Sequence, residues 1–265
     1  EFHQVSADYS FILGGLIHKL VSSDNNSHII AMTGSYFRGD NRCILKAEDI
    51  AAFSVVSYTY DQMLNGFKYL SSIKAGINFY NKSYHEAIKC VLDLNRKTII
   101  HIPSPNSHIS TTFSKYKEVE DILKMIGKED KREQQKRNLP DGIYAIKTHR
   151  GKTVIVADLV ENEDRIRKSV YRYLYNLKKR EDLDIIIALG TAKEGFDWKW
   201  CDTCITVGAR RSMTEVVQIM GRSLRDVRGK SDAQFINLVP FPQNENGESL
   251  NDVLSSISSL MLLEQ

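Results

Sequence analysis

The sequence lacks several features that would assign it to a class at once. No apolar run approaches the roughly 20 residues that a membrane-spanning helix needs, and the first ten residues lack the charged and apolar zones of a signal peptide. The formal net charge of +3 is too small to identify a nucleic-acid binder, because such proteins cluster their lysines and arginines locally. We therefore expect an intracellular, cytoplasmic protein without membrane association, and composition names no partner.

Cysteine is scarce. The chain has 4 cysteines, and only Cys201 and Cys204 form a Cys-x-x-Cys pair. Neither a second such pair nor a nearby pair of histidines accompanies them, whereas a structural zinc ion takes four ligands. We therefore predict no metal site, and we expect Cys204 in a buried strand with Cys201 just before it.

A phosphate-binding loop is also missing. The sequence Gly-x-x-x-x-Gly-Lys-Ser/Thr occurs nowhere in the 265 residues. That loop supplies backbone amides and a lysine to the phosphates of a bound nucleotide, and a hydroxyl to magnesium. A self-contained nucleotide-binding enzyme of another doubly wound family is therefore disfavoured.

Short apolar runs rich in β-branched residues alternate with stretches of helical spacing. This alternation predicts an α/β fold with a mostly parallel sheet that helices cover on both faces. The expected strands are residues 28–33, 97–102, 153–157, 184–189, 203–207 and 234–239. The expected helices are residues 9–21, 84–94, 115–126, 163–179 and 213–224. The polar stretches 128–137 and 243–248 are expected to be surface loops, and a boundary between two lobes is expected near residue 70.

The stretch from Ser212 to Arg225 predicts a helix that carries an arginine pair. Ser212 and Glu215 have the spacing of a reciprocal helix cap. Gln218, Arg222 and Arg225 stand at i, i+4 and i+7, so a helix would present them on one face. Two guanidinium groups on one face suit the oxygens of a phosphoryl group, although arginines at this spacing more often form a solvated face.

The loop that follows the expected strand 184–189 is polar and contains two glycines. Gly190 and Gly195 permit close backbone approach, Thr191 offers a hydroxyl, and Lys193 offers a cation. Asp197 offers an acceptor for a ribose hydroxyl or for an arginine. Each residue is ordinary alone, and the arginine helix some twenty residues later makes the combination notable.

Together, Gly190-Thr-Ala-Lys-Glu-Gly-Phe-Asp197 and Gln218-Ile-Met-Gly-Arg-Ser-Leu-Arg225 resemble the fifth and sixth motifs of superfamily 2 (DEAD/DEAH-type) helicases and translocases. The sequence Glu-Gly-Phe-Asp is most similar to the fifth motif of the branch that contains the motor subunits of type I and type III restriction enzymes. Earlier stretches match in order. Residues 32–40 resemble the third motif, residues 97–104 resemble the fourth, and Glu1-Phe2-His3 resembles the end of an Asp-Glu-x-His box.

The resemblance implies a RecA-like fold in two parts. Residues 1–70 would be the C-terminal part of a first RecA-like lobe, and residues 71–265 a complete second lobe. In the family, ATP lies between the lobes, and the second lobe donates arginines to phosphates that the first lobe holds. ATP and Mg²⁺ would therefore be bound mainly by an upstream RecA-like segment, and we expect the chain alone to bind ATP weakly and to turn it over poorly.

The resemblance also implies a role for each matched residue. Glu1, Gln218, Arg222 and Arg225 would be catalytic, with Glu1 acting on the attacking water and the two arginines stabilising charge on the phosphates. Gly195 and Asp197 would join the arginines in binding nucleotide. Thr33, Gly34, Ser35 and Arg38 would couple nucleotide state to movement, and contacts to nucleic acid would come from Pro103, Ser104, Thr191 and Lys193.

Several alternatives remain open at this stage. Glu-Gly-Phe-Asp favours DNA over RNA, but the motifs are shared with RNA helicases. A degenerate RecA-like module that binds nucleic acid or a partner without hydrolysis is a further candidate, although the intact arginine pair argues against it. A nuclease or methyltransferase could accompany the motor. Trp198 and Trp200 are expected to be packing residues, and the basic run 165–180 is expected to be a solvated helix face rather than a nucleic-acid contact.

Overall fold

The computed structural model describes residues 12–23, 28–32, 46–54, 56, 60–103, 114–189, 196–208 and 213–241. The chain divides into two compact units. The first comprises Glu1–Gly66 with Ser212–Gln218, and the second comprises Phe67–Arg211 with Ile219–Gln265. Among the described residues, no helix is long and apolar enough to cross a membrane.

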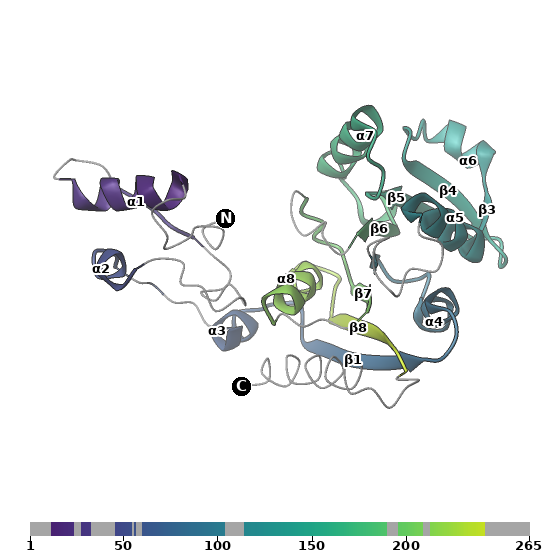
Figure 1. Cartoon of the computed structure of the whole chain (residues 1–265). Coiled ribbons are helices and arrows are strands. Elements are labelled where there is room, and N and C mark those ends of the chain that lie inside the picture. Colours follow the sequence, from purple (N-terminus) through teal and green to yellow (C-terminus); the bar gives the residue numbers. More distant parts are fainter. Residues whose placement is uncertain are drawn as a thin grey trace. The chain divides into compact units, whose positions relative to one another are not determined.

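Within its described residues, the first unit contains three complete helices, the first residues of a fourth, α8 (Met213–Ser223), and a small core (Figure 1). The complete helices are α1 (Ile12–Ser22), α2 (Ala47–Ile50) and α3 (Tyr60–Asn65). Ile17 of α1 is 5% exposed and packs against four partly buried residues, Val21, Ile29, Ile50 and Phe53. Nearby, His18 Nδ1 lies 2.9 Å from Asp49 Oδ1, which ties α1 to α2.

The prediction of a strand at residues 28–33 is wrong for residues 28–32, which the structure describes. Residues 28–32 are not in a strand, and Ile30 and Met32 are 86% and 78% exposed. A strand exists through hydrogen bonds to a neighbouring strand, and no described segment pairs with these residues. The apolar, β-branched composition of this segment was therefore not sufficient to form a strand.

The second unit is built on an eight-stranded sheet. Its strands lie in the order β1-β8-β7-β2-β6-β5-β4-β3, and neighbours run parallel except for β4, which is antiparallel to β5 and to β3. The strands are β1 (Ser72–Tyr80), β2 (Thr98–Ile102), β3 (Gly127–Glu129), β4 (Ile143–Thr148), β5 (Thr153–Asp158), β6 (Ile185–Leu189), β7 (Thr203–Val207) and β8 (Asp232–Pro240).

Helices cover both faces of this sheet (Figure 1). The helices α4 (Tyr84–Val91) and α5 (Lys115–Ile126) bury Ile88 and Ile122 against alternate residues of six strands, such as Ile100 of β2. The opposite face carries α7 (Asp164–Tyr175) and α8 (Met213–Ser223), and the Cys204 thiol of β7 lies 3.3 Å from the Ile219 carbonyl oxygen of α8. The structure therefore confirms the predicted α/β fold.

Residues 128–137 are not the loop that their polar composition suggested. They continue β3 and then form helix α6 (Lys131–Lys136). The Asp130 carboxylate accepts a hydrogen bond from the Glu133 amide at 3.1 Å and so caps α6. Gln134 of α6 then bonds the backbone of β4, donating to the Ile143 carbonyl at 2.7 Å and accepting from the Ala145 amide at 2.8 Å. Polar side chains thus build this segment through capping and strand-edge hydrogen bonds.

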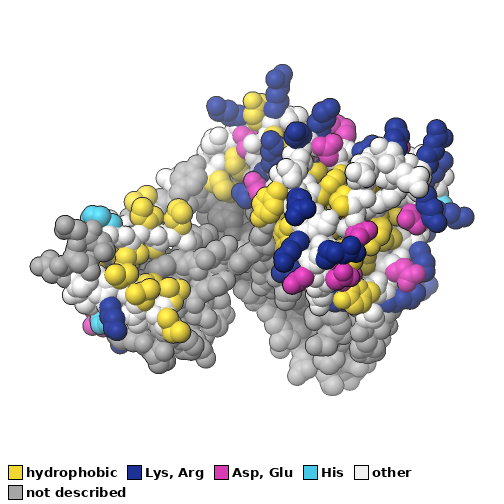
Figure 2. Space-filling model, turned by 90° about the horizontal axis from the view of Figure 1, so that it is seen from above, with side chains coloured by type: hydrophobic (Ala, Val, Ile, Leu, Met, Phe, Trp, Pro, Cys, Tyr) yellow, Lys and Arg dark blue, Asp and Glu magenta, His cyan; other side chains and the backbone are white. Residues whose placement is uncertain are grey.

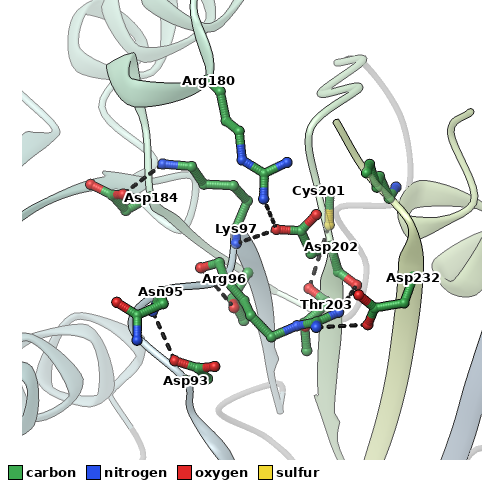
Figure 3. A network of polar contacts seen from close by, with 12 residues as sticks. Asp93, Asn95, Arg96, Lys97, Arg180, Asp184, Cys201, Asp202, Thr203 and Asp232 are labelled. Atoms are coloured by element: carbon green, nitrogen blue, oxygen red, sulfur yellow. Dashed lines mark hydrogen bonds and ion pairs between the residues drawn. The ribbon is translucent and has the colours of Figure 1, made fainter. Parts of the chain in front are cut away.

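A set of ion pairs joins the strands β2, β6, β7 and β8 where each begins (Figure 3). We call it the amino-end network. It consists of Arg96, Lys97, Arg180, Asp184, Asp202 and Asp232. Lys97 Nζ lies 2.7 Å from Asp184 Oδ1, and Asp202 Oδ2 accepts from the Lys97 amide at 3.0 Å and from Arg180 at 2.5 Å. Since Lys97 and Asp202 are 7% and 4% exposed, these charges are buried and paired.

Candidate functional site

Five of the predicted site residues lie in the described part of the chain. The other nine lie outside it, and these are Glu1, Thr33, Gly34, Ser35, Arg38, Ser104, Thr191, Lys193 and Gly195. The described five are Pro103, Asp197, Gln218, Arg222 and Arg225. The geometry of the site therefore rests on the arginine helix and on the end of the Gly190–Asp197 motif.

Arg222 stands in the last turn of α8 and is held by Phe196. Its Nη1 donates to the Phe196 carbonyl oxygen at 2.7 Å, and its guanidinium carbon lies 4.6 Å from the centroid of the Phe196 ring. The ring is buried, so one residue supplies both a hydrogen-bond acceptor and a cation–π surface. Burial lowers the pKa of Arg222, but a guanidinium remains charged at neutral pH. The contact fixes a positive charge beside the fifth-motif segment.

Arg225 does not belong to the helix, contrary to the i+7 prediction. The helix α8 ends at Ser223, and Arg225 lies in the irregular segment that follows. The Ser223 carbonyl accepts from the buried Lys230 ammonium, which ends the helix with a tertiary contact. Arg225 Nε lies 3.0 Å from Asp197 Oδ1, with the two side chains 54% and 68% exposed. Such an exposed ion pair contributes less than about 1 kcal/mol to stability. A phosphate could therefore replace the Asp197 carboxylate at Arg225.

Asp226 fixes the backbone immediately after Arg225. Its carboxylate accepts hydrogen bonds from three consecutive backbone amides, those of Lys68 at 2.8 Å and of Tyr69 and Leu70 at 2.9 Å. These bonds lower the pKa of Asp226, the bond from Lys68 most strongly. Sequence reasoning missed this residue, because the amides that it binds are more than 150 positions away. Asp226 therefore positions Arg225 without contacting it.

The structure brings Asp197, Arg222 and Arg225 together and places Pro103 elsewhere. The helix α8 begins after β7 ends and runs back along it, so its last turn lies toward the amino end of β7. Pro103, in contrast, is buried directly after the carboxyl end of β2. Parallel-sheet proteins usually bind ligands at the carboxyl ends of their strands. Arg222 lies instead in the last turn of a returning helix, and Arg225 lies just after that helix.

Two buried cysteines lie beside the arginine helix. Cys201 and Cys204 are both 0% exposed, as the sequence predicted for a strand and the residue before it, and their Sγ atoms are 3.9 Å apart. Burial raises the pKa of the Cys201 thiol, which makes the thiol less reactive. Trp198 is 4% exposed, which confirms its predicted packing role.

Gly221, in the middle of the arginine motif, has open space around it. A Cβ atom built on Gly221 would meet no described atom within 4 Å, apart from its own helix backbone. Glycine inside a helix costs about 0.5–1 kcal/mol relative to alanine. Nothing within the described structure requires this glycine, so the position is suited to an approach from outside.

A buried carboxylate marks the opposite end of the sheet. Asp158, the last residue of β5, accepts from the Val160 amide at 2.7 Å, while Lys115 of α5 donates to the Val160 carbonyl at 2.9 Å. Burial raises the pKa of Asp158 to about 6. Among the described residues, no group of three or more His, Cys, Asp or Glu side chains could hold a metal ion.

The fold and site thus define a protein with a mostly parallel α/β sheet and an arginine-bearing helix held by a Gly-rich motif. No protein-family model matches the chain. The chain is 46% identical over 269 aligned positions to the Bacillus subtilis (strain 168) protein named "Putative ATP-dependent helicase YeeB". The alignment covers 100% of this chain but 44% of YeeB, so the chain spans less than half the length of this relative.

Similar solved structures include two DNA-bound proteins. The Mycobacterium smegmatis helicase Lhr bound to ssDNA and AMP-PNP is 12% identical at a TM-score of 0.40, over 74% of this chain and 22% of that one. The type ISP restriction-modification enzyme LlaBIII bound to DNA is 13% identical at a TM-score of 0.38, over 76% of this chain and 14% of that one.

Proposed function

We propose that this chain is part of an ATP-dependent helicase or translocase related to YeeB and acting on nucleic acid, DNA in the first place. The support is the identity of 46% along the whole chain, together with the fifth and sixth motifs in order. Residues 1–70 are assigned to the C-terminal part of a first RecA-like lobe, and residues 71–265 to the second lobe.

The observation that carries this proposal is the paired placement of Arg222 and Arg225 on Phe196 and Asp197. A motor of this type needs cations that act on the phosphates of ATP and a connection from them to the nucleic-acid track. Arg222 is pre-oriented by a buried ring, and Arg225 is held by an exposed carboxylate that a phosphate can replace. Guanidinium groups stabilise the charge that spreads over phosphate oxygens during transfer.

The nucleotide itself would be bound mainly by residues outside this chain. The described residues include the arginine site, which fits phosphate oxygens, but no carboxylate cluster suited to Mg²⁺. ATP would supply the phosphoryl group that is transferred to water. In this chain, Gln218 would help to place the nucleotide or the water, Glu1 would position or deprotonate that water, and Gly195 would allow close approach of the backbone.

The remaining motif residues would connect ATP to movement along the strand. Thr191, Lys193, Pro103 and Ser104 would contact the phosphodiester backbone without reading bases. The third-motif residues Thr33, Gly34, Ser35 and Arg38 would couple lobe closure to these contacts. Alternating contacts of two lobes would then move the protein along its track.

The direct test is nucleic-acid-stimulated ATP turnover by the complete protein, with and without Arg222→Ala. Loss of an arginine that acts on phosphates lowers turnover by about 10³-fold or more. Arg222→Lys keeps a charge but loses the planar fork, so it should recover only part of this loss. Arg165→Ala is the control, because Arg165 is exposed and pairs with Asp141 and Glu163.

Three results would change the conclusion. Turnover that is unaffected by Arg222→Ala would remove the arginine from the mechanism. Tight binding of nucleic acid without any turnover would indicate a degenerate binding module. Stimulation by RNA but not by DNA of the same sequence would reassign the protein to the RNA helicases.

A further inference from the structure

The outer surface of α7 carries basic side chains. Val170 and Leu174 point inward and are 0% and 5% exposed. At 100° per residue, Lys168 and Arg172 fall on the side opposite these two residues, whereas Arg167 lies on the same side as Leu174. The side chains of Lys168 and Arg172 are exposed. We call Lys168 and Arg172 the α7 basic face.

These cations have no carboxylate partner among the described residues. The neighbouring Arg165 does, since its guanidinium lies 3.2 Å from Asp141 Oδ2 and 3.5 Å from Glu163 Oε1. Glu163 pairs with Arg165, and no described carboxylate lies within ion-pair distance of the α7 basic face.

The segment after α7 extends the same positive surface. Lys178 and Lys179 are exposed and also lack a carboxylate partner in the described chain. Glu181 and Asp182 follow closely in sequence, and Asp182 Oδ2 accepts from the backbone amides of Lys178 at 3.1 Å and Lys179 at 2.9 Å. Asp182 thus fixes the backbone of the two lysines and leaves their ammonium groups facing solvent.

The helix itself does not require this arrangement. Lys168 and Arg172 stand four positions apart, where like charges destabilise a helix by about 0.2–0.5 kcal/mol. Asp164, four positions before Lys168, offsets this by a similar amount, and Arg172 gains from its place in the last turn. An exposed face with two cations that make no ion pair within the described chain is suited to an external anion.

We infer that the α7 basic face, together with Lys178 and Lys179, binds the phosphodiester backbone of duplex DNA. This inference rests on the proposed function and adds a second contact region, separate from the loops at the motifs. The described surface seen from above carries Lys and Arg side chains with acidic ones among them (Figure 2). Contacts of lysine and arginine with phosphates carry no sequence information and release counterions, so the surface would strengthen binding to any sequence.

The experiment measures the dissociation constant of the 265-residue chain for a mixed-sequence duplex DNA over a range of salt concentrations. The variant is Lys168→Ala/Arg172→Ala. Each phosphate contact contributes about 0.9 to the slope of log affinity against log salt for duplex DNA. The double variant should therefore reduce the slope by about two and weaken binding equally for unrelated sequences.

A matched control comes from α5, which has the same length. Lys117→Ala/Lys124→Ala also removes two exposed charges, but both lysines pair with acids on their own helix. The slope of this control should equal that of the wild type within measurement error, and thermal unfolding should show that both variants are folded. An equal fall of the slope in both double variants would show that only the total charge matters, which would overturn the site. An unchanged slope in the α7 variant would overturn it as well.

The proposed function and this inference fail in distinguishable ways. If the wild-type chain binds duplex DNA and the α7 variant keeps the full slope, the α7 contact is wrong while the motor stands. If binding depends on α7 but Arg222→Ala leaves turnover intact, the arginine mechanism is wrong while the contact stands. If the wild-type chain binds no duplex DNA at 50 mM salt, the α7 contact is wrong.

Discussion

Two groups of basic side chains in the second unit differ in what surrounds them. In the amino-end network, Lys97 and Arg180 each meet a carboxylate, and the carboxylates of Asp184 and Asp202 also accept backbone amides. On the α7 basic face, Lys168 and Arg172 meet no carboxylate in the described chain. The first group forms ion pairs that hold strands together, whereas the second forms no ion pair with a described residue. Residues of the second kind are where binding to other molecules should be sought.

The largest effect is expected where the paired group is broken. Asp202→Ala leaves the buried Lys97 amide and the Arg180 guanidinium without their acceptor, so we expect the free energy of unfolding to fall by about 3 kcal/mol. Asp232→Ala, at the partly exposed pair with Arg96, should cost less, about 1 kcal/mol, because Arg96 keeps its hydrogen bonds to Thr203 and to the Asp202 carbonyl. Urea denaturation checks both. Similar losses for the two variants would show that burial does not separate these pairs.

Asp158 is a buried carboxylate that, unlike those of the amino-end network, forms no ion pair with a described residue. Its pKa is raised to about 6 by burial, against about 3.9 in an unfolded chain. The folded state therefore holds the proton more tightly, so its stability is greatest below pH 4 and falls as the pH rises through 6. Asp158→Asn should add about 1–2 kcal/mol at pH 7 and little at pH 4. A gain of equal size at both values would contradict the ionisation argument.

No described contact requires a glycine at position 221. Gly221→Ala should raise the free energy of unfolding by about 0.5–1 kcal/mol, because alanine favours a helix and the space is open. ATP turnover by the complete protein should nevertheless fall, since the added methyl group obstructs an approach to the arginine motif. Denaturation and turnover are measured on the same variant. Unchanged turnover would mean that nothing approaches Gly221 closely.

The smallest effect is expected on the stability of α7. Lys168→Ala/Arg172→Ala removes a like-charge pair and introduces two good helix formers, so we expect no loss and a gain of about 0.2–0.5 kcal/mol. Lys117→Ala/Lys124→Ala on α5 should cost a similar amount, because it removes favourable pairs. Thermal unfolding at low salt compares them. A clear loss in the α7 variant would show that these cations stabilise the fold.

The elements with strong local signals were predictable from the sequence. The helix α5 and the strand β7 have the predicted bounds, because an amphipathic period and a continuous β-branched run are each sufficient locally. The strand β1 was missed, since its alternation is weak and its conformation is stabilised by pairing with β8 from Ser72↔Asp232 to Tyr80↔Pro240. That pairing joins residues 160 positions apart, and no local pattern reports it.

The candidate site was predictable in its residue types but not in its geometry. Sequence reasoning selected Asp197, Arg222 and Arg225, and the structure brings these three together. It did not find Phe196 as the acceptor for Arg222, because the accepting atom is a backbone carbonyl oxygen, which every residue has. It also placed Arg225 on the helix, since the contact that ends α8 at Ser223 comes from Lys230, farther along the chain.

The contacts of Phe196 and Asp197 have a mechanical consequence. Consecutive residues at the end of one motif hold the two guanidinium groups of the other, so neither motif can shift freely while both contacts persist. A phosphate that draws either guanidinium away loosens the 196–197 segment. By thermodynamic reciprocity, a ligand that pulls on this segment makes the arginines more available to phosphate by the same free energy. The combined strength of the 2.7 Å hydrogen bond, the cation–π contact on Phe196 and the exposed ion pair therefore sets an upper limit on the free energy that this route can transmit.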